Sequence, residues 1–183
     1  MYGTNRLILR QWRSEDYEHF ARLNADPQTM RFFPSPLTRP ESDNLADKIV
    51  GLIAHRGWGF WAVELPGEAP FIGFVGLHIP TSALPFSPCV EIGWRLDRAY
   101  WGHGYATEAA EFALEYGFSD LQLDEIVSFT AVQNRPSQAV MKRIGMKSND
   151  DFFEHPELPF GHPLRLHVLC RLSRSDWLAQ NRN

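Results

Sequence analysis

The spacing of hydrophobic residues changes along the chain, and each change marks a different kind of structure. Apolar residues recur every three or four positions in 14–27 and 38–57, as they do on helices that bury one face. Short aromatic and β-branched runs follow at 59–65, 71–79 and 89–96, separated by turns rich in Pro and Gly. These runs predict consecutive antiparallel strands, so two helices precede the main part of a sheet.

The remaining segments alternate between strand and helix. A first strand is predicted at 6–12, before the two helices. After the antiparallel strands, a helix of about fifteen residues follows Gly104. A strand at 125–132, a helix at 135–145 and a last strand at 165–172 complete the chain. This order is typical of the mixed α/β or α+β class.

Residues at the ends of the first two predicted helices are typical of helix caps. Ser14 precedes the first helix and Pro27 follows it. Thr38 and Glu41 have the spacing of a capping box at the start of the second helix, and Gly57 is positioned to end it. We therefore expect both helices to have sharp boundaries.

Composition narrows the class of protein. The 183 residues, 44% of them hydrophobic and 22% charged, suit a single domain that spans 1–183 and buries a substantial core. No stretch reaches the roughly 18 consecutive apolar residues of a membrane helix, and the N-terminus does not resemble a secretory signal. We expect a cytoplasmic protein with no membrane partner. Its net charge of −4 provides no broad basic surface, so no nucleic-acid partner is expected either.

Neither the two cysteines nor the histidines form a disulfide or metal motif. Cys89 and Cys170 lie in apolar, strand-like runs without CxxC spacing, and we interpret them as buried, reduced thiols. His155, His162 and His167 have spacings that match no compact set of ligands, and the loop around them is shaped by prolines. No metal is expected.

The segment WGHGYATEAAEFALEYGF, residues 101–118, carries the clearest chemical signal. Gly102 and Gly104 come directly before a helix whose small residues recur at three- and four-residue spacings. The free N–H groups at a helix start, with the positive end of the dipole, suit an anion such as phosphate. The glycines also lack the Cβ atoms that would keep phosphate away. A tight strand-to-helix turn would explain the same glycines, so the pattern alone leaves both interpretations open.

Residues 91–146 closely resemble the coenzyme A binding half of the GNAT superfamily of N-acetyltransferases, above all the branch that acetylates N-termini of ribosomal proteins. The family pattern is Gln or Arg, two residues, Gly, one residue, then Gly or Ala. It falls on 101–106, with Trp101 in place of Gln or Arg. The resemblance covers nearly the whole chain. It implies the GNAT fold, a mixed α+β architecture with a mostly antiparallel twisted sheet of about seven strands and about four helices on both faces.

The resemblance also assigns roles to individual residues. It implies that coenzyme A is bound by the loop and helix start, by the backbone of strand 89–96, and by an Asn that contacts the pantetheine arm. In this sequence these are Trp101, Gly102, His103, Gly104, Tyr105, Ala106 and Thr107, then Ile92, Gly93 and Trp94, and finally Asn134. A gap between this strand and 125–132 would admit the arm. Ser137 would lie near the sulfur as a candidate general acid. Taken alone, Asn134 and Ser137 could equally be helix caps.

The reaction further needs a base and an acceptor pocket. Glu91 lies at the edge of the strand beside the expected thioester, where a carboxylate could take the proton of the amine directly or through water. An ordinary solvated strand residue is the alternative. Phe32, Phe33 and His78 are candidates for contact with the acceptor, with core or surface positions as the alternatives.

We therefore predict an acetyl-CoA-dependent N-acetyltransferase, an acyltransferase that moves an acetyl group to a primary amine by direct attack on the thioester. The amine belongs to a protein N-terminus or to a small molecule, and acetyl-CoA is a cosubstrate. The alternative is a noncatalytic coenzyme A binding or regulatory module with the same fold. We expect a monomer or homodimer, with the strand at 165–172 as a candidate dimer edge.

Overall fold

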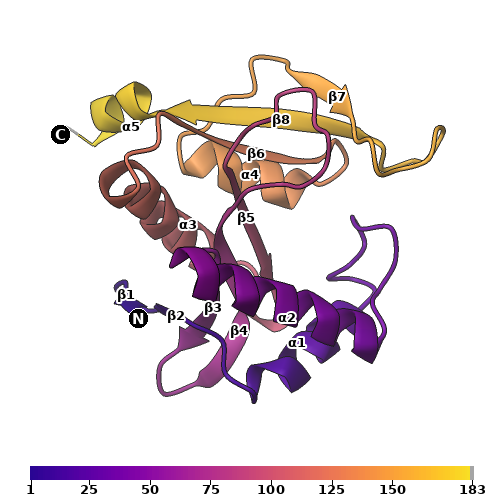
Figure 1. The fold of residues 1–183 in the computed structure, drawn as a ribbon, viewed down its shortest axis with the longest axis vertical. Helices are drawn as coiled ribbons and strands as arrows, with labels where there is room; N and C mark the ends of the chain where they lie inside the picture. The colour runs from indigo at the N-terminus through magenta and orange to yellow at the C-terminus, as the bar shows by residue number, and fades with distance from the viewer. Residues whose placement is uncertain (182–183) are drawn as a thin grey trace.

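An eight-stranded sheet forms the centre of the computed structural model, which describes residues 1–181 (Figure 1). The strands follow the order β1-β2-β3-β4-β5-β6-β8-β7, antiparallel except where β5 meets β6. They are β1 (Tyr2–Gly3), β2 (Ile8–Arg10), β3 (Phe60–Leu65), β4 (Ala69–His78), β5 (Glu91–Leu96), β6 (Glu125–Ala131), β7 (Phe152–Glu154) and β8 (Leu166–Ser173). The predicted mixed α+β class with a mostly antiparallel sheet is confirmed.

Four of the five α-helices in residues 1–181 lie where the hydrophobic spacing predicted them. The five are α1 (Asp16–Ala25), α2 (Arg39–Arg56), α3 (Tyr105–Glu115), α4 (Arg135–Arg143) and α5 (Arg174–Gln180). The helix predicted after Gly104 is longer than α3 because the chain continues as a π-helical turn, Tyr116–Asp120. The sequence analysis did not predict β1, β7 or α5, which are short and carry little periodic signal.

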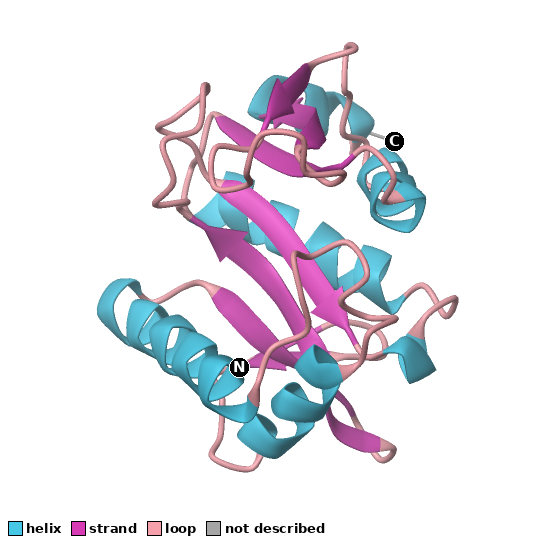
Figure 2. Cartoon of the chain, turned by 90° about the vertical axis from the view of Figure 1, so that its right-hand side faces the viewer, coloured by secondary structure: helices cyan, strands magenta, loops and turns pink. Residues whose placement is uncertain are grey.

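The sheet buries a different set of side chains on each face, because successive strand residues point in opposite directions. On one face Phe74 of β4 packs against Phe20 of α1, with ring centroids 5.9 Å apart. On the other face Trp61 of β3 packs against Phe112 of α3, also at 5.9 Å. Helices therefore cover both sides of the sheet (Figure 2).

The predicted boundaries of α2 are confirmed, whereas the predicted cap of α1 is wrong. Thr38 and Glu41 form both halves of the capping box, and Gly57 ends α2 with a left-handed φ of 83°. In α1 the residue before the helix is Glu15, and Ser14 does not cap it. The start of α1 is fixed instead by the buried Asp16, which binds Arg10 at 2.7 and 2.9 Å.

The narrow face of α3 lies close to the sheet, as its small residues predicted. Ala109, Ala110 and Ala113 are completely buried. Gly117, one turn further, leaves no room for a side chain, since a Cβ there would lie 2.6 Å from Ile126 of β6. This packing fixes where the N-terminus of α3 lies relative to strands β4 and β5.

Strands β5 and β6 separate soon after they meet. Their parallel pairing has a single register pair, Glu91 with Val127, supported by a hydrogen bond from the Val127 N–H to the Val90 carbonyl at 2.9 Å. Beyond that point β5 continues its pairing with β4, while β6 pairs with β8. The gap expected between these two strands is present, and it opens toward the start of α3.

Strand β8 is an interior strand, which corrects the expectation that 165–172 forms a dimer edge. It pairs with β6 along one side and with β7 along the other. The isolated bridge between Lys147 and Arg171 extends the covered part of that second side. The backbone groups that a second chain would need there already bond to β7 and to residues 147–151.

The cysteines are free, as the sequence predicted, although only one of them is fully buried. Cys170 is buried and Cys89 is partly exposed, and burial raises the pKa of both thiols. Within residues 1–181, no helix combines the length and the apolar character that a membrane span requires.

Candidate active site

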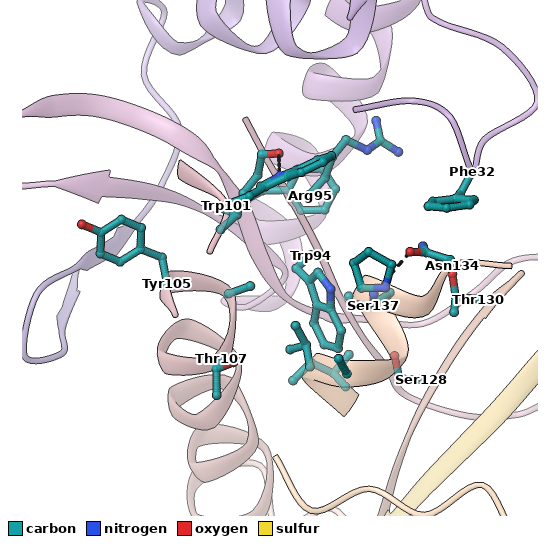
Figure 3. A pocket seen from close by; sticks show the side chains of 18 of the residues that line it. Phe32, Trp94, Arg95, Trp101, Tyr105, Thr107, Ser128, Thr130, Asn134 and Ser137 are labelled. Carbon is teal, nitrogen blue, oxygen red and sulfur yellow. Dashed lines mark hydrogen bonds between the residues drawn. The ribbon is translucent and has the colours of Figure 1, made fainter. Parts of the chain in front are cut away.

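A cavity of about 1280 Å³ occupies the gap between β5 and β6. The starts of α3 and α4 and the loop around Phe32 and Phe33 complete its walls. In Figure 3, Tyr105 and Thr107 of α3 lie on one side of the cavity. The side chains of β6 and α4 lie on the other side, and Trp94 of β5 stands between the two groups.

The cavity brings together nearly all the residues that the sequence singled out. All the candidates for the coenzyme, the base, the acid and the acceptor wall line it, with His78 as the exception: Phe32, Phe33, Glu91, Ile92, Gly93, Trp94, Trp101, Gly102, His103, Gly104, Tyr105, Ala106, Thr107, Asn134 and Ser137. His78 lies directly opposite Glu91 in the β4–β5 register and stacks on Phe60 at 5.2 Å. It is therefore a neighbour of the site and not part of its lining.

The loop before α3 has the geometry of an anion site. Gly102 and Gly104 have φ values of 81° and 82°, a left-handed conformation that strongly favours glycine. A Cβ atom added at Gly102 would have no neighbour within 4 Å, and one added at Gly104 would meet only the Arg6 guanidinium. Within residues 1–181, the backbone N–H groups of 102–107 have no hydrogen-bond acceptor. The tight turn is present, and its geometry is compatible with the predicted anion site, so the two interpretations of the glycines do not exclude each other.

A network that the sequence analysis missed holds this loop in place. Arg6 donates from Nη1 to the carbonyl of His103 at 2.9 Å and pairs with Glu108 of α3 at 2.7 Å. Thr4 donates to the same carboxylate at 2.6 Å. Burial opposes ionisation of Glu108, but the hydrogen bonds from Thr4 and Arg6 outweigh it and lower the pKa. About a hundred residues separate the partners, so no local pattern could have revealed the network.

The start of α4 confirms that Asn134 is a helix cap that also lines the cavity. Its side-chain oxygen accepts a hydrogen bond from the Ser137 N–H at 3.3 Å, and its Nδ2 donates to Thr130 of β6 at 2.9 Å. The Ser137 bond uses the main chain, and the Ser137 hydroxyl makes no hydrogen bond to any residue in 1–181. That hydroxyl is available to a bound molecule.

Glu91 has the most perturbed carboxyl group of the site. Phe60 packs closely over the backbone of Gly93, where a Cβ would lie 3.1 Å from the ring and 3.7 Å from the Glu91 Oε1. Within the described chain, the carboxyl group makes no ion pair or side-chain hydrogen bond that would stabilise its charge. Burial raises the pKa of Glu91 to about 8. A carboxyl group with this pKa can gain or lose a proton near neutral pH.

The part of the cavity wall formed by β5 and by the loop around Phe32 carries two arginines and two phenylalanines. Arg95 of β5 lies 4.1 Å over the ring of Phe33, and Arg31 lies 4.8 Å over the ring of Phe32. Arg95 shares a strand face with Glu91, so the two-residue period of β5 could have identified it from the sequence.

Two histidines extend the cavity on the β8 side. His155 and His167 line it with ring centroids 4.9 Å apart, and burial lowers the pKa of both. Among residues 1–181 no group of three or more His, Cys, Asp or Glu is arranged to bind a metal ion.

Comparisons with known proteins identify the family. The family model described as an acetyltransferase (GNAT) domain matches residues 6–147. The FsC-acetyl coenzyme A-N(2)-transacetylase of Aspergillus fumigatus is 30% identical over 98% of this chain and 78% of its own length. A GNAT-family acetyltransferase from Bacillus anthracis superposes with a TM-score of 0.78 at 26% identity, covering 94% of this chain and 98% of that one.

The predicted branch also occurs among the structural neighbours. The ribosomal-protein-S5-alanine acetyltransferase of Vibrio fischeri superposes with a TM-score of 0.72 over 96% of this chain and 97% of its own. At 18% identity this likeness shows the fold alone.

Proposed function

This chain belongs to the GNAT acetyltransferase family and is an acetyl-CoA-dependent acyltransferase, and we propose that it acetylates a primary amine with Glu91 as base and Ser137 as acid. The observation that carries the proposal is the convergence of two groups in one cavity. One is the run of free N–H groups at 102–107, and the other is the Glu91 carboxyl with its raised pKa.

In this proposal the loop before α3 binds the pyrophosphate of coenzyme A. The free N–H groups and the positive end of the α3 dipole stabilise the negative charge. Arg6 adds a cation at the same place and holds the loop through the His103 carbonyl. The gap between β5 and β6 receives the pantetheine arm, whose amides pair with the backbone of β5 around Gly93 and Trp94.

The bound thioester supplies an activated acetyl group to the amine. A neutral amine attacks the carbonyl carbon, the bond to sulfur breaks, and the nitrogen loses a proton to Glu91. Before the attack, the Glu91 carboxylate can also take the proton of the ammonium form of the acceptor. An α-amino group has a reference pKa of about 8, which matches the pKa of about 8 of Glu91, so that earlier transfer has little driving force in either direction. The Ser137 hydroxyl lies on the α4 wall and donates a proton to the leaving thiolate. Neither cysteine lines the cavity, which supports direct attack over an acyl-enzyme.

The test is a calorimetric titration with acetyl-CoA of the wild type and of two matched variants. Gly104→Asp places a carboxylate in the proposed phosphate site. Gly67→Asp introduces the same strain in the β3–β4 turn, since Gly67 has a φ of 78° and open space around it, away from the cavity. We expect acetyl-CoA binding to weaken at least about tenfold in Gly104→Asp and to stay unchanged in Gly67→Asp. Equal affinities of the two variants for acetyl-CoA would show that residues 102–107 do not bind its pyrophosphate.

A further inference from the structure

Arg95 is a partly buried cation that lines the cavity, and no anion among the described residues pairs with it. Its Nη1 donates to the side-chain oxygen of Asn24 at 2.7 Å, and its Nε is buried without a hydrogen-bond partner. Within residues 1–181, no carboxylate lies within 4.0 Å of the guanidinium. Burial lowers the pKa of Arg95 to about 10, so the group still carries its charge at neutral pH.

Arg10, which is almost completely buried, shows how carboxylates compensate a buried guanidinium elsewhere in this chain. Arg10 pairs with Asp16 and Glu64, each at 2.7 Å, and donates to the carbonyl of Pro70. Burial alone would lower its pKa, but these partners reverse the effect and raise it. Arg95 has only the neutral Asn24 in an equivalent place, and a buried charge without a counter-ion is costly.

A purely structural role for Arg95 does not require a cation. Asn24 is fully buried and already held by a hydrogen bond from its Nδ2 to Ser42 of α2 at 2.9 Å. A neutral amide on β5 could donate to Asn24 equally well. What a guanidinium adds is a charge and further N–H groups, and the Arg95 side chain lines the cavity.

Arg95 is also at a suitable distance from the reacting atoms. It points to the same face of β5 as Glu91 and Gly93, which lie about 13 and 7 Å away along a strand that rises about 3.3 Å per residue. Arg31, a second guanidinium without an ion pair among the described residues, lines the same wall over Phe32. Two cations on this wall repel a polyamine and attract an anion.

We propose that the amine acceptor carries a carboxylate and that Arg95 binds it, so that the substrate class is amino-carboxylates. The bound acceptor crosses the cavity over the Phe60 ring, which covers Gly93, with its amine near Glu91 and its carboxylate at the Arg95 guanidinium, beside the ring of Phe33. This inference rests on the proposed function, because it uses the same cavity and the same base. The carboxylate belongs either to a free amino acid or to an acidic side chain close to a peptide N-terminus.

The experiment compares each acceptor that carries a carboxylate with a counterpart in which a carboxamide replaces it. One arm uses ω-amino acids of two to eight carbons, each paired with its carboxamide. The other arm uses short peptide amides whose second residue is Asp or Asn. Release of coenzyme A gives kcat/KM for every compound. For the wild type we expect at least one acid to exceed its amide about tenfold or more, because a charge-assisted contact to guanidinium is lost in the amide. The arm that shows this preference identifies the source of the carboxylate.

Three variants assign the preference to Arg95. In Arg95→Gln the ratio of kcat/KM for the acid to kcat/KM for the amide falls toward one. Arg95→Lys retains part of the preference for the acid because the positive charge remains. Asn24→Asp keeps the arginine and the size of its neighbour but supplies an internal counter-ion, and we expect it to reduce the ratio as strongly. Circular dichroism and acetyl-CoA titration confirm that each variant is folded.

The outcomes separate this inference from the proposed function. Turnover with equal use of acids and amides by the wild type overturns the inference and leaves the proposed function standing. An acid preference that survives in Arg95→Gln also overturns it. Failure to bind acetyl-CoA overturns the proposed function. If no amine in the panel is turned over, titration of the coenzyme A-bound protein with the N-acetylated acids and amides provides the same comparison, and equal affinities refute the role of Arg95.

Discussion

Replacing Glu91 with Gln should make the protein more stable and at the same time less active. The carboxyl group is partly buried beside Phe60, and no residue in 1–181 pairs with its charge. Its pKa is about 8 in the folded protein and 4.5 in the reference state. Folding therefore favours the protonated form, and Gln is a neutral side chain of the same shape.

The sign of the pH dependence follows from these two values. Below pH 4.5 the carboxyl group is protonated in both states and folding loses nothing. Between pH 4.5 and 8 the unfolded chain releases the proton and the folded chain retains it, so stability falls as pH rises. From pH 4.5 to 7 this amounts to about 3 kcal/mol at about 1.4 kcal/mol per pH unit, and residual contact with solvent reduces it to about 2 kcal/mol. Above pH 8 the loss is complete.

Urea denaturation of the wild type and of Glu91→Gln at pH 5, 6, 7 and 8 measures this effect. We expect the free energy of unfolding of the variant to exceed that of the wild type by an amount that grows with pH and levels off near pH 8. Other titrating groups contribute equally to both proteins and cancel in the difference. The same variant should lose about 10²- to 10⁴-fold in kcat with an acceptor amine, as expected for removal of a general base. A stability difference that does not change with pH would refute the assignment of the raised pKa to Glu91.

Three further substitutions test the proposed acid and the buried ion pair at the start of α1. Ser137→Ala should lower kcat about tenfold or more without weakening acetyl-CoA binding, because the Asn134 cap uses the Ser137 main-chain N–H and not its hydroxyl. An unchanged kcat would indicate that water is the proton donor. Asp16→Ala should lower the free energy of unfolding by about 3–5 kcal/mol, since it leaves the buried Arg10 without its main partner. As a control, Asp43→Ala breaks only the exposed pair with Arg39 and should change the free energy of unfolding by less than about 1 kcal/mol in the same denaturation assay. Equal losses of stability in Asp16→Ala and Asp43→Ala would contradict the argument from burial.

Much of the cavity lining could be predicted because its residues lie in short segments of the sequence. Gly102 and Gly104 stand two residues apart before a helix, and their left-handed conformation depends on that local turn. The Asn134 cap and the small face of α3 are equally local. The fold class followed from the change between helical and strand spacing.

Other features were outside the reach of any local pattern. Ser14 has the chemistry of a cap, but the ion pair between Asp16 and Arg10 decides where α1 begins. The last long strand could have been an edge, and β7, a strand of three residues, makes it an interior strand.

The sequence by itself determined the elements of this protein, their buried faces and the loop that suits a phosphate, because each depends on residues that are neighbours along the chain. Only the tertiary structure decided that β5 and β6 separate, that Arg6 holds the loop before α3, and that Arg95 lines the cavity without a carboxylate partner. Those properties depend on which distant segments lie side by side. A hydrophobic period specifies which face of an element is buried, and not which neighbour covers it.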